Sequence, residues 1–170
     1  MKKTVILGIG NTILRDEGLG VKALELLKRD YEFTPEVELL DGGTLGIDLL
    51  YFLEGAERLL VLDAVLGGGK PGDLHIFKGD GVKSYFRRKV SMHEIGFQEV
   101  LGLLELRGSD IKEIVVMGIE PKDIELGTEL SPEVEGSLPE LVNEALKQLE
   151  EWGIRPVQRL GMNEEYREDT

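Results

Sequence analysis

The sequence predicts an α/β fold: a three-layer sandwich with a twisted, mostly parallel central sheet and helices on both faces. Two observations predict it. Short apolar stretches alternate along the chain with longer amphipathic ones, as in proteins that join parallel strands through helices. Two of the short stretches, residues 59–62 and 114–117, are continuously apolar, which is typical of central strands buried on both faces.

The predicted elements follow in chain order. Strands are expected at residues 3–8, 37–40, 58–64, 74–77 and 111–118, with a short edge strand at 156–160. Helices are expected at residues 19–29, 47–53, 96–106 and 135–152. No internal repeat or linker divides these elements, so we predict one domain over residues 1–162 and a polar, flexible tail at 163–170.

Composition excludes several classes of function. The chain has no cysteine, which rules out disulfides, thiolate metal sites and cysteine nucleophiles. The net charge of -13 argues against nucleic acid or an anionic membrane as a partner. No apolar stretch reaches the ~20 residues of a membrane span, and no signal peptide precedes the first strand. We therefore expect a cytoplasmic protein, and we expect it to be a monomer.

The glycine-rich turn at residues 8–20 carries the most information. Gly8 and Gly10 resemble the start of a dinucleotide-binding fingerprint, but Ile13 stands where the third glycine is needed. Asp16 and Glu17 would also repel a pyrophosphate at the start of the following helix. The turn therefore favours a site that uses acids over one that binds a nucleotide.

Three other motifs are incomplete. Residues 67–70 read Gly-Gly-Gly-Lys, but Pro71 stands where a P-loop needs Ser or Thr. His93-Glu94 resembles the start of a zincin motif, but Phe97 occupies the place of the second histidine. The glycine–Ser–glycine elbow of the serine hydrolases is absent. His75 lies inside a predicted strand, and we interpret it as structural.

Three candidate residues remain, and they converge. Glu17 follows the first strand, Asp63 ends a central strand, and His93 precedes a helix. Open α/β sheets build their sites where strands end at the carboxyl edge, so all three are expected near that edge. Two carboxylates and an imidazole form a suitable ligand set for a divalent metal with open positions.

At this point the sequence resembles the hydrogenase maturation proteases, the endopeptidases that trim the C-terminal extension of the nickel–iron hydrogenase large subunit. The resemblance covers nearly the whole chain, in the family's order and spacing. It rests on five motifs: residues 8–11 (Gly-Ile-Gly-Asn), 16–20 (Asp-Glu-Gly-Leu-Gly), 41–44 (Asp-Gly-Gly-Thr), 63–65 (Asp-Ala-Val) and His93.

The resemblance implies a function and a site. It implies that Glu17, Asp63 and His93 are the catalytic and metal-binding residues. It implies that Asp41, Gly42, Gly43 and Thr44 contact the substrate, a hydrogenase large-subunit precursor. The metal would be nickel, carried by the precursor or bridging the two proteins, and zinc or cadmium could occupy the site in vitro.

Two alternatives stay open. A metal-binding chaperone or sensor without peptidase activity would use the same three ligands. A nucleotide-binding enzyme is the third reading of the chain.

Overall fold

The computed structural model describes residues 3–45, 48–87 and 97–159. Its main sheet contains β1 (Lys3–Gly8), β3 (Glu38–Asp41), β4 (Ala56–Ala64), β5 (Leu74–Lys78) and β6 (Glu113–Ile119), in the order β3-β1-β4-β6-β5. The first four strands of this order are parallel, and β5 joins the edge antiparallel to β6. This is the α/β sandwich that the alternating pattern predicted.

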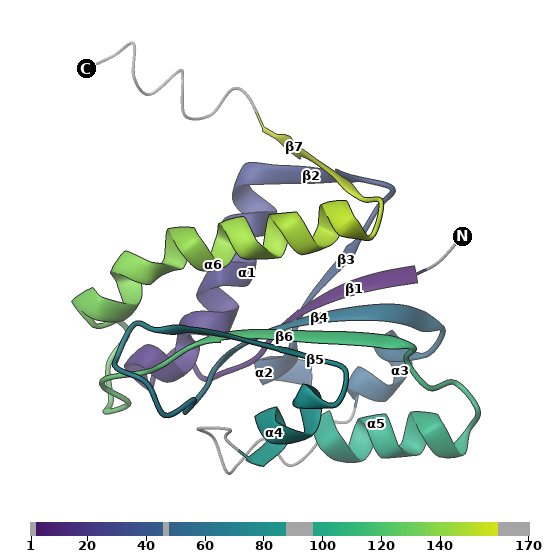
Figure 1. Cartoon of the computed structure of the whole chain (residues 1–170), viewed down its shortest axis with the longest axis horizontal. Helices are drawn as coiled ribbons and strands as arrows, with labels where there is room; N and C mark the ends of the chain where they lie inside the picture. Colours follow the sequence, from purple (N-terminus) through teal and green to yellow (C-terminus); the bar gives the residue numbers. More distant parts are fainter. Residues whose placement is uncertain (1–2, 46–47, 88–96, 160–170) are drawn as a thin grey trace.

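The helices form the two outer layers. α1 (Leu19–Asp30) and α6 (Pro132–Glu151) cover one face of the sheet, whereas α3 (Leu49–Leu53), α4 (Gly81–Arg87) and α5 (Phe97–Leu106) cover the other (Figure 1). Side chains of β1 alternate between the faces: Ile6 enters the core under α1 and α6, while Val5 and Leu7 enter the opposite core. Both faces of the sheet are therefore buried, which explains the continuous apolar runs.

Several elements differ from the prediction. The segment 156–160 is not an edge strand of the main sheet: β7 (Arg155–Gln158) pairs antiparallel with β2 (Tyr31–Thr34) in a separate two-stranded sheet. β2 was not predicted, because its four residues follow α1 without a turn signal. Residues 42–45, expected as a loop, form the short helix α2 (Gly42–Leu45), and α4 was also missed.

The start of α6 lies three residues before its predicted position. Ser131 has extended backbone angles and Pro132 is the first helical residue, the place where a proline without an N–H is best tolerated.

The carboxyl ends of the parallel strands meet at one edge of the molecule. The connections that leave this edge are the segments after β1, β3, β4 and β6, and Figure 1 shows three of these, after β1, β4 and β6, gathered on the left of the molecule. Among the helices of the described ranges, none is both long enough and apolar enough to cross a lipid bilayer.

Candidate active site

Glu17 lies on η1 (Arg15–Gly18), the single 3₁₀ turn between β1 and α1. Its residue surface is only 7% exposed. No residue in the described part of the chain donates a hydrogen bond to its carboxylate, although its backbone N–H donates to the Leu14 carbonyl at 3.1 Å. The Glu17 oxygens are not among the fully enclosed side-chain atoms without a partner in the described residues, so the carboxylate keeps a small opening to solvent, through which a ligand can reach it.

Two glycines allow the turn to take this position. Gly10 has φ 139°, and a Cβ there would lie 1.9 Å from the Glu17 carbonyl oxygen. A Cβ on Gly20 would lie 2.1 Å from the Leu62 carbonyl oxygen of β4. Gly20 therefore gives the close packing of helix on strand that the dinucleotide fingerprint assigns to its third glycine. Ile13, in the place of that glycine, is 54% exposed.

Asp16 has a different task from its neighbour. It is fully buried, and its carboxylate accepts hydrogen bonds from the backbone N–H groups of Lys122 (2.9 Å), Asp123 (2.9 Å) and Ser131 (2.7 Å). The Ser131 hydroxyl donates a fourth bond, at 2.7 Å. Burial alone would raise the pKa of Asp16, but these hydrogen bonds outweigh it and hold the pKa below its ordinary value. Asp16 thus ties the turn to the segment that leads into α6.

Further bonds hold the same two segments together. The Asp16 N–H donates to the Asp123 carbonyl at 2.9 Å, the Arg15 N–H donates to the Gly127 carbonyl at 3.0 Å, and the Gly127 N–H donates to the Ile13 carbonyl at 2.9 Å. The Arg15 guanidinium is paired with the Asp123 carboxylate. The turn that carries Glu17 is therefore held in place by bonds from its neighbours in the sequence to the connection between β6 and α6.

Asp63 lies near the end of β4 and is 3% exposed. Its Oδ1 accepts from the Ala64 N–H at 2.8 Å, and its Oδ2 accepts from the hydroxyl of Tyr85 at 2.7 Å. The η1 turn packs directly against β4. The structure thus brings Glu17 and Asp63 to the same carboxyl edge, as the sequence predicted.

The segment 41–44 borders this edge. Asp41 pairs with Gly8 in the parallel ladder between β3 and β1, and its Oδ1 accepts from the Gly43 N–H at 2.9 Å. A Cβ on Gly43 would lie 2.4 Å from the Gly10 carbonyl oxygen. The backbone at Gly43 therefore packs closely against the glycine-rich turn that follows β1. Gly42 begins α2, which also holds Thr44.

The remaining candidate ligand, His93, lies outside the described residues. Within the described ranges, no group of three or more His, Cys, Asp or Glu residues forms a metal cluster. The structure therefore describes Glu17 and Asp63 but not His93, and the assignment of all three as metal ligands stays a prediction.

The Gly67–Gly69 loop has a structural partner. The carboxylate of Glu120, buried at the end of β6, accepts from the Gly67 N–H at 3.0 Å and from the Gly69 N–H at 2.7 Å. The His75 ring lies 3.3 Å from the same carboxylate, which supports the structural interpretation of His75. Because a carboxylate occupies these amides, the loop is not available to a phosphate.

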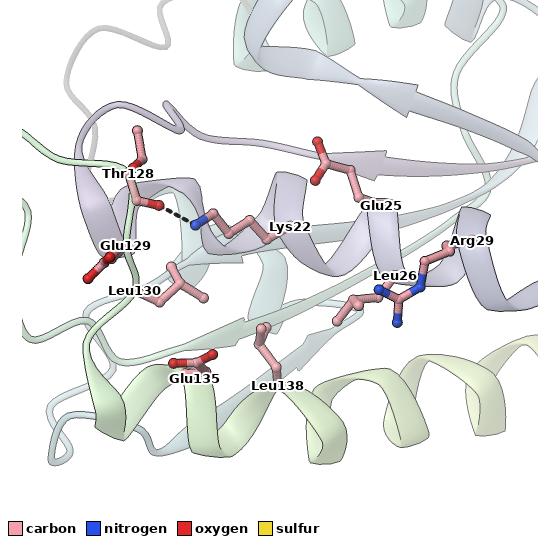
Figure 2. Close-up of a pocket in the computed structure, with 9 residues that line it drawn as sticks. All are labelled: Lys22, Glu25, Leu26, Arg29, Thr128, Glu129, Leu130, Glu135 and Leu138. Carbon is pink, nitrogen blue, oxygen red and sulfur yellow. Dashed lines mark hydrogen bonds between the residues drawn. The ribbon is translucent and has the colours of Figure 1, made fainter. Parts of the chain in front are cut away.

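A groove of about 780 Å³ lies between α1 and α6, beside the segment that precedes α6 (Figure 2). Its apolar lining consists of Leu26, Leu130 and Leu138, and charged residues of both signs surround these three side chains. Lys22 points across its end to the Thr128 carbonyl (Figure 2). Neither Glu17 nor Asp63 lines this groove, so it is separate from the candidate site.

Comparison with known proteins agrees with this geometry. The family model described as "Hydrogenase maturation protease" matches residues 21–148. The hydrogenase expression/formation protein HoxM of Cupriavidus necator is 38% identical over 157 residues, which cover 91% of this chain and 78% of that protein. The chain belongs to the hydrogenase maturation protease family.

A solved structure extends the match to the fold. The hydrogenase maturating endopeptidase HybD from E. coli superposes with a TM-score of 0.86 at 32% identity, covering 92% of this chain and 98% of that one. The hydrogenase 2 maturation protease of Escherichia coli K12 is also 32% identical, over 158 residues that cover 92% of this chain and 96% of that protein. As a hydrogenase maturation protease, the protein is an endopeptidase and hence a hydrolase.

Proposed function

We propose that this protein removes the C-terminal extension of a nickel-loaded hydrogenase large-subunit precursor. The observation that carries the proposal is the buried Glu17 carboxylate, which accepts no hydrogen bond from the described residues and lies at the same sheet edge as Asp63. Membership of the hydrogenase maturation protease family supports the peptidase chemistry. The cytoplasm is the compartment in which we expect this reaction.

Glu17, Asp63 and His93 are the proposed ligands of the metal. Their oxygen and nitrogen donors suit a borderline divalent cation, and the Glu17 carboxylate fits such a group because no described residue donates a hydrogen bond to it and a cation would give it a partner. The cation would be the precursor's nickel or a metal bridging the two proteins, with zinc or cadmium as substitutes in vitro. A bound cation would polarise a scissile carbonyl and acidify water.

The protein's own carboxylates have different surroundings. Asp63 is oriented by two hydrogen bonds, which suits a ligand of fixed direction. Glu17 has no such donor among the described residues, so it can also take the proton of an attacking water as a general base. Asp41, Gly42, Gly43 and Thr44 are the proposed substrate contacts, since they border the turn that carries Glu17.

The surface near the site suits a protein substrate. Ile13 is 54% exposed and Leu126 is 80% exposed, and the bond between the Gly127 N–H and the Ile13 carbonyl brings their backbones together. A bound protein would remove both aliphatic side chains from water, which favours association. We propose that the folded body of the precursor covers them while its C-terminal extension reaches Glu17.

The test is cleavage of the precursor. The purified protein is mixed with a nickel-loaded large-subunit precursor, and the mass of the large subunit is measured. We expect loss of a C-terminal peptide, abolished by Glu17→Ala and by His93→Ala. An intact precursor together with retained metal binding would contradict the proposal and favour the non-proteolytic chaperone.

A further inference from the structure

Tyr85 contributes a polar group to an otherwise apolar core. It is fully buried on α4, in the core between the sheet and the helices α3, α4 and α5 (Figure 1). Its ring centroid lies 6.1 Å from that of Phe77 and 5.0 Å from that of Phe86. A phenylalanine would fill the same space, so packing alone does not explain the hydroxyl.

The hydroxyl is directed at the candidate site. It donates to Oδ2 of Asp63 at 2.7 Å, a short distance of the kind made to a charged acceptor. With Oδ1 accepting from the Ala64 N–H, each oxygen of Asp63 has at least one donor, and these bonds fix the plane of the carboxylate.

We propose that Tyr85 is a positioning residue that orients Asp63 for its ligand. The inference rests on the proposed role of Asp63 and goes beyond it, because it assigns a function to a residue that does not itself contact substrate. Buried partners of metal-binding side chains commonly change metal affinity or activity by 10- to 100-fold when they are removed. The phenol acts through the direction of one carboxylate, so its loss should leave the docking of the precursor unchanged.

The experiment compares Tyr85→Phe with Tyr51→Phe, which removes the same hydroxyl from an exposed residue of α3. Three quantities are measured: the affinity of the purified protein for Zn²⁺, kcat and KM for precursor cleavage, and the midpoint of thermal unfolding. For Tyr85→Phe we expect Zn²⁺ binding weaker by about 10- to 100-fold and a kcat lower by a similar factor, with KM nearly unchanged. Tyr51→Phe should match the wild type in all three.

Two artificial amino acids at position 85 separate the hydrogen bond from the packing. p-Aminophenylalanine keeps a donor at the ring's para position, and p-methylphenylalanine of similar size does not. The first should recover Zn²⁺ affinity and kcat, and the second should behave as Tyr85→Phe. If Tyr85→Phe folds poorly, the comparison of these two variants still tests whether the hydrogen-bond donor at position 85 is needed. If the wild-type protein binds no Zn²⁺, kcat alone provides the test.

The outcomes that overturn the inference are distinct from those that overturn the function. Wild-type affinity and kcat in Tyr85→Phe with a lowered unfolding midpoint would show that Tyr85 is only structural. If Asp63→Asn abolishes cleavage in the same series, the proposed function survives that result. If Asp63→Asn cleaves normally, the proposed role of Asp63 fails and the inference fails with it.

Discussion

At the scale of single residues, the adjacent acids Asp16 and Glu17 have different roles: one stabilises the turn and the other is the candidate site residue. Asp16 is saturated with hydrogen bonds and fixes the turn, whereas Glu17 is buried with no donor among the described residues. The sequence predicted that this turn serves a site built from carboxylates and not a nucleotide-binding site, and it identified Glu17 as the candidate residue. It could not reveal the anchoring role of Asp16, because the donors lie more than 100 positions away in the chain.

Replacing Glu17 should therefore separate stability from activity. Glu17→Gln removes a charge that no described residue stabilises with a hydrogen bond, so we expect stability to stay unchanged or rise by about 0.5–2 kcal/mol. Cleavage of the precursor should fall by about 100-fold or more, because the ligand and base are lost. Thermal unfolding and product mass measure the two effects. Glu25→Gln, on the exposed side of α1, is the matched control and should change neither.

Replacing Asp16, in contrast to replacing Glu17, should lower the stability of the protein. Asp16→Asn keeps the shape but loses the charge that four donors surround, and we expect a loss of about 1–3 kcal/mol in the free energy of unfolding at neutral pH. Urea denaturation measures it. A stability equal to that of the wild type would contradict the anchoring role of Asp16.

The lowered pKa of Asp16 also predicts a pH dependence. Its ordinary pKa is 3.8, and the folded value is lower, so the stabilisation is fully present above pH 3.8. It is lost as the pH falls through the lowered folded value, where the carboxylate must take up a proton. Wild-type stability should therefore decline below about pH 4, and the decline should be shallower in Asp16→Asn. Parallel acid limbs would show that other carboxylates cause the decline.

At the scale of elements, close contact between α1 and β4 sets the position of the turn. A methyl group on Gly20 would meet the Leu62 carbonyl oxygen, so Gly20→Ala should push α1 away from the sheet. We expect a loss of about 1–3 kcal/mol and a large loss of cleavage, because η1 moves with the helix. Gly136→Ala on α6 is the control: nothing lies within 4 Å of its added Cβ, and it should stabilise by about 0.5–1 kcal/mol.

Element prediction succeeded where periodicity is strong. β1 lies at its predicted bounds, and α1 differs by one residue, because apolar spacing and glycine punctuation agree there. β2 and α4 were missed because they are short and hold few buried residues of their own: Phe33 in β2 and Tyr85 in α4. Their positions depend on tertiary packing, which no local pattern records.

The missed helix had a consequence for the site. Tyr85 lies between the basic residues Lys83 and Arg87, so the local sequence resembles a solvent-exposed segment. Its bond to Asp63 spans 22 positions and exists only because α4 packs under the sheet. In the sequence, the signal for this bond is a tyrosine among aromatic residues that are expected to be buried, and it can be read only once the helix α4 is recognised.

At the scale of the whole molecule, the strong negative charge influences encounter with the substrate. With a net charge of -13, the protein would repel an acidic partner, so we expect basic patches on the precursor near its docking surface. The kcat/KM for cleavage should then fall several-fold as salt rises from about 0.05 to 0.5 M, with kcat little changed. A kcat/KM independent of salt would count against this electrostatic complementarity.

The central claim is that the acids at the carboxyl edge of the sheet act on a nickel-loaded precursor. The most direct measurement is the mass of the large subunit after incubation with this protein, using precursor with and without nickel, alongside Glu17→Gln. The account predicts loss of the C-terminal peptide only from nickel-loaded precursor and only with the wild-type chain. Equal cleavage by Glu17→Gln, or no cleavage of nickel-loaded precursor by the wild type, would contradict it.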